Sequence, residues 1–314
     1  MPVVNMRKLI VICGPTATGK TSLGVILSQK LGGEIVSADS RQVYKGMDIG
    51  TGKEWGKDVV VWGYDLADPR HDYSVAQYVK FAQKAIIDIQ ERGRLPILVG
   101  GTGLYIKAVV DGIPTVSVPR NSELRDKLSG KPPDELYEAL SNLDSVRAAS
   151  MNFSDKKNPR RLIRAIEIAQ WELSHGKSSP SISRPVAPSS ILFIGLTAPR
   201  EFIEKKIEAR VSDRIKKGIK LEIRDLLKGG VKWEDQSMMS LGYRQWRDYF
   251  EGAVDEARAV LEWIREEKKY ARRQITWFKK DKRILWFDVS EPDYPKSVEK
   301  LAEKWYKMGY VEKD

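Results

Sequence analysis

Short runs of apolar residues alternate with amphipathic stretches over much of the chain. Six such runs predict β-strands, at residues 9–13, 34–38, 59–64, 95–99, 191–196 and 284–289. The run at 9–13 is apolar throughout, as expected for a strand that is buried on both faces of a parallel sheet. Between these strands the apolar residues often recur with the spacing of a helix, for example over 22–31 and 75–89. This alternation of strand and helix predicts a doubly wound α/β domain.

The pattern changes between residues 114 and 190, where no strand-like run occurs. Short, charged helical stretches are predicted at 122–128, 134–143 and 159–173. A Gly/Ser/Pro-rich linker over 176–190 then leads back to the core. We expect the final helix of the chain to be peripheral, because it is rich in polar residues. The predicted organisation is a core α/β domain, a small all-helical insertion domain, and the remainder of the core with the C-terminal helices, at residues 1–115, 116–190 and 191–314.

The first predicted strand leads into residues 14–21, GPTATGKT, which fit the phosphate-loop pattern G-x-x-x-x-G-K-[ST]. Glycines in such a loop let backbone N–H groups converge on phosphate oxygens, and the start of the following helix adds partial positive charge. Lys20 supplies a full positive charge, and the hydroxyl of Thr21 suits a phosphate-bound Mg²⁺. Strand, loop and helix stand where the motif requires them. We therefore predict that the protein binds a di- or triphosphate group.

Two further polar turns follow predicted strands and are candidates for the same crevice, at the carboxyl ends of the sheet. Asp39 directly follows the second predicted strand, and its position leaves open a catalytic carboxylate, a Mg²⁺ ligand or a helix cap. Gly100–Gly103 either faces the crevice or is a plain tight turn. No Asp follows the strand at 95–99, where the second acidic motif of a phosphate-loop NTPase would place one. Residues 45–58, rich in Gly and Lys, have the composition of a mobile loop.

The composition narrows the class of protein. The 314 residues exceed one typical domain, and 54 Lys and Arg against 43 Asp and Glu give a formal charge of +11. Such an excess is common in proteins that bind polyphosphates or nucleic acid. The single cysteine, Cys13, excludes a disulfide framework and a Cys-based zinc site, and we expect it in the core. Without a long apolar run or a recognisable signal peptide, we expect a cytoplasmic protein.

Two basic segments suggest contacts with RNA, although each has an ordinary alternative. Arg160, Arg161 and Arg164 lie close together on one predicted helix, either as phosphate ligands or as a solvated face. Residues 261–283 interleave basic residues with four aromatic ones, Trp263, Tyr270, Trp277 and Phe278. That mixture suits base stacking combined with phosphate contact. A helix that packs its aromatics inward would look the same, and this is our default interpretation.

Several blocks of sequence resemble, in order, those of the tRNA dimethylallyltransferase family: GPTATGKT, SADSRQVYKGMDIGTGK, YSVAQYV, LPILVGGTGLYIKAVVDG, NPRRLIRAIEI, LGYRQ and YARRQITWF. The resemblance implies a P-loop NTPase-like fold and transfer of a dimethylallyl group from its diphosphate to a tRNA adenosine. The acceptor would be the exocyclic amine of the adenosine just 3′ of the anticodon. Mg²⁺ is the implied cofactor, and dimethylallyl diphosphate and the anticodon stem-loop of tRNA are the implied partners. We also expect a monomer with no membrane association.

The same resemblance implies roles for individual residues. Asp39 would be the general base, Arg210 would grip the diphosphate, and Thr21 would act in catalysis and as the metal ligand. Residues implied to bind the diphosphate are Gly14, Pro15, Thr16, Ala17, Thr18, Gly19, Lys20 and Thr21. Residues implied to contact tRNA are Asp39, Ser40, Arg41, Gln42, Thr102, Arg125, Arg160, Arg161, Arg164, Gly242, Tyr243 and Arg244.

The chain departs from the family pattern at Trp62–Asp68, where many relatives carry a Pro-His-His-Leu-Ile-Asp-like block, and at Asp155–Pro159. The insertion is short, and no Cys/His zinc finger is appended, which resembles bacterial members. Three rival functions share part of the pattern: a small-molecule kinase, an isopentenyltransferase acting on free adenine nucleotides, and an RNA-binding module without activity. The missing acidic motif disfavours the kinase, and the basic insertion disfavours an enzyme that acts on free nucleotides. The RNA-binding module is disfavoured because it would leave Lys20 and Asp39 without a role.

Overall fold

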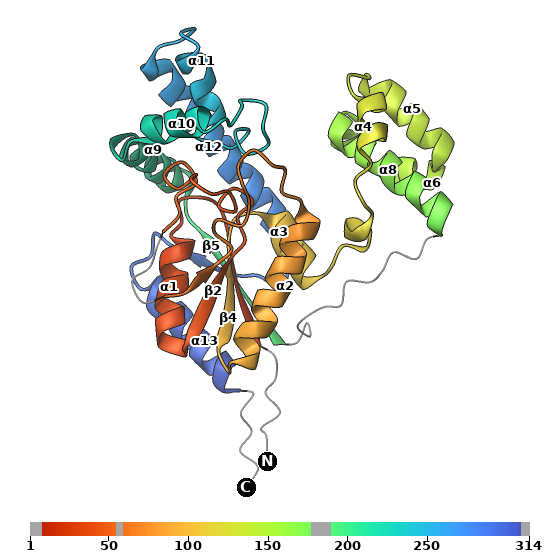
Figure 1. The fold of residues 1–314 in the computed structure, drawn as a ribbon. Helices are drawn as coiled ribbons and strands as arrows, with labels where there is room; N and C mark the ends of the chain where they lie inside the picture. The colour runs from red at the N-terminus through yellow and green to blue at the C-terminus, as the bar shows by residue number, and fades with distance from the viewer. Residues whose placement is uncertain (1–7, 55–58, 177–189, 309–314) are drawn as a thin grey trace. The chain divides into compact units, whose positions relative to one another are not determined.

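The computed structural model describes residues 8–54, 59–176 and 190–308 of the chain (Figure 1). The chain divides into two compact units, one formed by Met1–Asp111 with Arg184–Asp314 and the other by Gly112–Ser183. The insertion was predicted over 116–190, so the second unit begins and ends somewhat earlier in the chain. Most of the predicted linker, residues 177–189, lies outside the described residues.

A six-stranded parallel sheet forms the centre of the larger unit, in the order β3-β2-β4-β1-β5-β6. The strands are β1 (Leu9–Cys13), β2 (Gly33–Ser37), β3 (Val61–Trp62), β4 (Leu95–Val99), β5 (Ile191–Thr197) and β6 (Leu285–Asp288). β1 lies between β4 and β5, with Ile12 opposite Val99 on one side and Ile194 on the other. From β1 the chain adds β2 and β3 on one side, returns to insert β4 between β2 and β1, and then crosses to the other side of β1 to add β5 and β6. Such a reversal places a ligand crevice at the carboxyl ends of the neighbouring strands.

Helices cover both faces of this sheet, which confirms the predicted doubly wound α/β fold. In Figure 1, α1 (Lys20–Leu31) and α13 (Tyr294–Lys307) lie on one face, and α2 (Val75–Glu91) and α3 (Gly103–Val110) lie on the other. Successive strand residues point to opposite faces. Ile10, Ile12 and Ile97 therefore pack in one core with side chains of α1 and α13. Cys13 is buried, as predicted.

The C-terminal helix α13 is not peripheral, so that prediction is wrong. Val298 and Ala302 are both fully buried, and Leu301 and Trp305 pack against the same core. These positions form a single apolar stripe along the helix, although charged residues dominate the segment as a whole. A narrow apolar stripe that includes a small residue is sufficient to pack a helix against a sheet.

Helix ends in the larger unit follow the sequence closely. α2 begins with the predicted capping box, in which Ser74 Oγ accepts from Gln77 N and Gln77 Oε1 accepts from Ser74 N, at 3.2 and 2.9 Å. α1 ends at Gly32 in the left-handed conformation. β3 is shorter than the predicted strand at 59–64, because only Val61 and Trp62 pair with β2.

A helical layer connects β5 to β6. It comprises α9 (Arg200–Lys216), α10 (Ile219–Lys228), η3 (Arg244–Trp246), α11 (Arg247–Phe250) and α12 (Glu256–Phe278). α12 packs against α9 and η3, and the fully buried Trp246 and Trp263 meet edge-to-face at its centre. The sequence had not predicted α10, which starts directly after the left-handed Gly218 that ends α9.

All elements among the described residues of the smaller unit are helices. It contains η1 (Pro114–Ser117), α4 (Ser122–Leu128), α5 (Pro133–Leu143), α6 (Ser145–Ser150), α7 (Phe153–Lys156) and α8 (Pro159–His175). α5 and α8 pack through a small core that includes Leu136, Leu140, Leu162 and Ile166. α6 and α7 had not been predicted, since each is too short to show a periodic pattern. Over the described parts of the whole chain, no helix is both long and apolar enough to cross a membrane.

Candidate active site

The phosphate loop leaves β1 and curls back into α1. Gly14 has φ +131°, and a Cβ there would lie 2.3 Å from the carbonyl oxygen of Leu196 in β5, so only glycine fits. Ala17 and Gly19 also have positive φ values of 64° and 78°. Gly19 precedes the first turn of α1 without a side-chain cap. The free N–H groups of this helix start therefore face the loop, as an anion site requires.

Lys20 is the positive charge at the base of the loop. Its Nζ donates to the carbonyl oxygen of Pro15 at 2.6 Å, and Thr18 Oγ1 donates to the same oxygen at 2.9 Å. The pKa of Lys20 is lowered to about 8, first by burial and then by the nearby positive charge of Arg210. A buried ammonium group without a carboxylate directly bonded to it is stabilised by an incoming anion.

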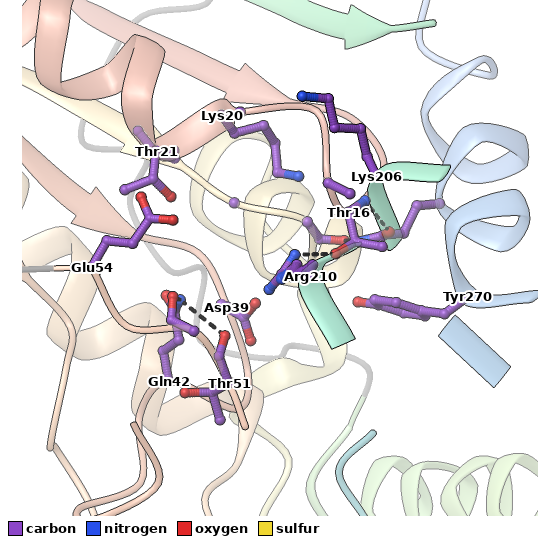
Figure 2. Close-up of a pocket in the computed structure, with 17 residues that line it drawn as sticks. Thr16, Lys20, Thr21, Asp39, Gln42, Thr51, Glu54, Lys206, Arg210 and Tyr270 are labelled. Atoms are coloured by element: carbon purple, nitrogen blue, oxygen red, sulfur yellow. Dashed lines mark hydrogen bonds between the residues drawn. The ribbon is translucent and has the colours of Figure 1, made fainter. Parts of the chain in front are cut away.

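A cavity of about 260 Å³ opens beside the loop, at the carboxyl ends of β1, β2 and β4. In Figure 2, Lys20 and Arg210 point into it, Asp39 lies between Thr21 and Tyr270, and Glu54 lies on the Thr21 side. Besides these, its lining comprises Thr16, Ala17, Gly19, Gln42, Thr51, Gly52, Val99, Gly100, Gly101, Lys206 and Gln274. The second glycine-rich turn thus faces the crevice, which the sequence had left open.

Helix α9 brings three cations to this region. Arg210 Nη1 donates to Thr16 Oγ1 at 2.6 Å and so connects α9 to the phosphate loop. Lys206 and Arg214 lie one turn before and after Arg210, on the same face of the helix. Arg214 is 4% exposed, and its pKa is lowered to about 10 by burial and then by Arg210. Of these three cations only Arg210 was predicted to act here, although basic residues four apart were a visible signal in the sequence.

Gln274 of α12 connects the two glycine-rich turns. Its Oε1 accepts from Thr16 N at 2.8 Å, and its Nε2 donates to the carbonyl oxygen of Gly101 at 2.9 Å. The side chain is 5% exposed, so both bonds are shielded from water. Gln274 therefore holds the loop after β1 in register with the loop after β4. Sequence reasoning missed it, because nothing local marks a glutamine as the partner of loops more than 170 residues away.

The segment predicted as a mobile loop is clamped over residues 45–54, and residues 55–58 lie outside the described part. Lys53 Nζ donates to the carbonyl oxygen of Tyr44 at 2.7 Å, and it pairs with Asp48 and Asp65 at 2.6 Å each. The carboxylate of Glu222 in α10 accepts from three successive backbone N–H groups, those of Asp48, Ile49 and Gly50. These contacts hold Thr51 and Gly52 against the cavity.

A second cavity, of about 230 Å³, shares five lining residues with the first: Thr16, Asp39, Thr51, Arg210 and Tyr270. Its remaining lining is rich in arginine with some apolar side chains, and comprises Ser40, Arg41, Gly50, Arg214, Met239, Leu241, Arg244, Glu267 and Arg273. Asp39 therefore contributes to both cavities. Its Oδ1 accepts from Arg41 N at 2.8 Å, and a turn rather than a helix follows. This excludes the helix-cap interpretation of Asp39.

The residues of the larger unit that were predicted to contact tRNA differ in whether a ligand could reach them. Ser40, Arg41 and Arg244 line the second cavity. Thr102 Oγ1 accepts from Ser40 N at 3.0 Å and supports that turn.

Two of the residues predicted to contact tRNA are buried. Tyr243 is fully buried and donates to Glu222 Oε1 at 2.6 Å. Gln42 is also buried, and its amide bonds to Ser37 Oγ and to the carbonyl oxygen of Gly52. Gly242 has φ +86° and packs against Trp263, so this part of the turn is structural as well.

In the smaller unit, most of the predicted arginines make internal contacts. Arg125 pairs with the buried Glu167 at 2.6 Å, and Arg164 pairs with the same carboxylate at 3.1 Å. Arg164 Nη2 also donates to the carbonyl oxygens of Thr115 and Val118. Arg161 pairs with Asp155. Arg160 is exposed.

Comparisons with known proteins identify the family of this chain. The model of the IPP transferase family matches residues 42–281, and that of the isopentenyl transferase family matches residues 7–60. A tRNA dimethylallyltransferase of Thermomicrobium roseum is 37% identical over 310 residues, covering 96% of this chain and 92% of the relative. One from Pelotomaculum thermopropionicum is 38% identical over 287 residues, covering 90% of each chain.

Solved structures show the same likeness. The crystal structure of a tRNA isopentenylpyrophosphate transferase from Bacillus halodurans has a TM-score of 0.71 and 34% identity, covering 96% of this chain and 98% of that one. A eukaryotic dimethylallyltransferase acting on tRNA has a TM-score of 0.80 at 24% identity and shares the fold. With a family model and relatives that extend over most of its length, this chain belongs to the tRNA dimethylallyltransferase family of IPP transferases.

Proposed function

We propose that the protein transfers a dimethylallyl group from dimethylallyl diphosphate to an adenosine of tRNA, the one just 3′ of the anticodon. The observation that carries this proposal is the position of Asp39 in the lining of two adjoining cavities. One cavity contains the phosphate loop, and the other is lined by arginines and apolar side chains. A reaction between a diphosphate and a nucleotide needs a proton acceptor at the junction of two such pockets.

The donor's diphosphate would occupy the first cavity. Lys20, the N–H groups of the loop and Arg210 surround this space, and they would stabilise the negative charge that develops on the leaving diphosphate. Arg210 is already oriented by its bond to Thr16. Lys206, one turn away on α9, adds a third positive charge to the lining.

The lining of this cavity also suits Mg²⁺. The hydroxyl of Thr21 and the carboxylate of Glu54 are hard oxygen donors in the same wall, and proteins hold Mg²⁺ with few such groups plus substrate phosphates. Thr21 and Glu54 would hold the ion, which would supply charge neutralisation for the diphosphate. A cluster of three or more acidic, His or Cys ligands is not found among the described residues.

The acceptor adenine would enter the second cavity, extruded from its loop. Tyr270, Met239 and Leu241 provide apolar contact for the base, and the surrounding arginines suit the adjoining phosphates. In the transfer, the exocyclic nitrogen forms a bond to the allylic carbon and the bond from that carbon to the diphosphate oxygen breaks. The amine proton passes to the carboxylate of Asp39, and diphosphate leaves with the bonding electrons.

The helical unit is proposed to extend the tRNA contact. Arg160 lies in the first turn of α8, exposed, beside Arg161. Arg164 and Arg125 support the unit through Glu167, so we propose them as residues that shape the surface rather than as phosphate ligands.

Incubation with labelled dimethylallyl diphosphate, Mg²⁺ and unmodified bulk tRNA, followed by nucleoside analysis, tests the proposal directly. We expect a dimethylallylated adenosine at the position 3′ of the anticodon and negligible label on free adenine nucleotides. A parallel incubation with ATP and small metabolites is the control. Robust phosphorylation of a metabolite, without any modified adenosine, would show that the site is that of a kinase.

A further inference from the structure

The four aromatic residues that are interleaved with basic residues along α12 have different environments. Trp263 and Phe278 are 0% and 4% exposed and belong to the core. Tyr270 lines both cavities of the candidate site. Trp277 remains 42% exposed, although large aromatic side chains are usually well buried. Inward packing, the default expectation from the sequence, therefore applies to two of these residues and not to Trp277.

Gly103, at the start of α3, determines where the Trp277 side chain can lie. A Cβ on Gly103 would lie 2.1 Å from Trp277 Nε1, so glycine allows the indole to rest against the backbone where α3 begins. Gly103 directly follows Gly101 and Thr102. Gly101 lines the first cavity, which would hold the donor, and Thr102 accepts a hydrogen bond from the backbone N–H of Ser40. The indole is thus held beside the wall of the candidate site and still presents part of its surface to solvent.

Residues on one face of α12 connect Trp277 to the acceptor cavity. Tyr270, Arg273 and Trp277 are spaced by three and four residues, which places them along the same side of the helix. Tyr270 and Arg273 line the second cavity. The face therefore runs from that cavity to the exposed indole, with aromatic and basic side chains in alternation.

A third cavity, of about 390 Å³, adjoins Trp277 and has an apolar floor with a basic rim. Ile106 and Phe193 are in the floor, and the rim carries Lys107, Lys280, Lys282 and Arg283 against only two carboxylates, Asp111 and Asp281. Both carboxylates accept from Arg283, at 2.8 and 2.6 Å. The three lysines consequently leave a positive rim, which complements a polyanion.

We propose that Trp277 and this rim form a stacking site for an unpaired base of the RNA loop, next to the adenosine that is modified. The proposal rests on the proposed function above. An adenosine that leaves its stack exposes the face of a neighbouring base, and an indole restores the lost stacking without regard to sequence. The lysines on the rim then contact the phosphates on either side of that base. The ligand of this site would be a single-stranded RNA segment that continues from the adenosine bound in the second cavity.

Two substitutions separate stacking from bulk. Trp277→Leu keeps an apolar side chain over Gly103 and removes the aromatic face, whereas Trp277→Phe retains an aromatic face. The probe is a labelled anticodon stem-loop RNA, with its affinity measured by fluorescence anisotropy. We expect Trp277→Leu to weaken binding by about 5- to 100-fold, the usual worth of one stacked base, and Trp277→Phe to stay within a few-fold of the wild type. Affinity for dimethylallyl diphosphate should not change. Leu261→Ala, an exposed position on the same helix, is the matched control and should bind RNA normally.

A second measurement distinguishes a base contact from a structural effect. The stem-loop is made with an abasic nucleotide at one loop position at a time. At the stacked position, loss of the base should weaken binding to the wild type and have little further effect on Trp277→Leu. If Trp277→Leu binds all RNAs as the wild type does, or if every abasic penalty persists in the variant, the stacking site is wrong. Transfer to tRNA by the wild type is measured separately, so the proposed function can stand or fail independently.

Discussion

Asp39→Asn is the most informative perturbation of the candidate site. The carboxylate has two roles in the structure: its Oδ1 accepts from Arg41 N at 2.8 Å, and it lines both cavities. Asparagine keeps a carbonyl oxygen for the Arg41 N–H group but cannot take up a proton. Asp39→Ala removes both functions. The pair of variants therefore separates the chemistry from the support of the turn.

The expected magnitudes differ widely. A positioned general base is worth about 10²- to 10⁴-fold in rate, so both variants should lose turnover by that factor. Loss of one turn-stabilising hydrogen bond costs about 1 kcal/mol, and only Asp39→Ala should show it in the free energy of unfolding. The carboxylate also faces the cavity that receives the diphosphate, together with Lys20. Removing a negative charge there should leave donor affinity unchanged or increase it, because like charges repel.

Single-turnover transfer with tRNA and dimethylallyl diphosphate both saturating is the assay, combined with a Mg²⁺ titration and urea unfolding. A Mg²⁺ ligand would behave in the opposite way, since Asp39→Asn would bind the donor more weakly and extra Mg²⁺ would restore part of the rate. Near-normal single-turnover transfer by Asp39→Asn would refute the role of Asp39 as the base. It would also remove the main reason for placing the reaction at the junction of the two cavities.

Four further outcomes are expected. Donor affinity should fall as the pH rises through about 8, because the buried Lys20 loses its proton there. A binding titration between pH 7 and 10 checks this. Arg210→Met should weaken donor binding and move that fall to higher pH, since the charge of Arg210 is one of the causes that lower the pKa of Lys20. Gly14→Ala should lower the free energy of unfolding in urea by at least about 1 to 3 kcal/mol and should impair donor binding. Gly130→Ala is the control, because Gly130 has a φ of +79° but no atom would lie within 4 Å of an added Cβ. It should affect stability less and leave donor binding unchanged. Arg160→Ala should lower the salt-dependence slope of tRNA binding by roughly 0.7 to 0.9 without loss of stability. Arg164→Ala should instead lower the free energy of unfolding, measured by thermal unfolding, by roughly 2 kcal/mol, because it removes a partner of the buried Glu167. Equal stability of the two variants would contradict the structural role of Arg164.

Local patterns were sufficient to predict much of the core. The apolar runs of β1, β4 and β5, the capping box of α2 and the phosphate loop all depend on residues close together in sequence, so their form is visible without the fold. The local signals failed where they were weak or ambiguous. α6 and α7 are too short for periodicity, and the stripe of α13 is narrow and includes a small residue. A loop rich in Gly and Lys looked mobile because its clamp, Glu222, lies more than 170 residues away.

By itself, the sequence determined the chemistry that the chain can offer: a phosphate loop with Lys20, a carboxylate at the end of the second strand, and an excess of basic residues. Only the tertiary structure decided which of these groups share a space. It brought Arg210 and Gln274 to the phosphate loop, placed Asp39 between two cavities, buried Tyr243, and left Trp277 exposed. Burial depends on which distant elements pack over a residue, and helical spacing alone does not specify them. The identical aromatic and basic pattern in α12 therefore serves the core at Trp263 and faces solvent at Trp277.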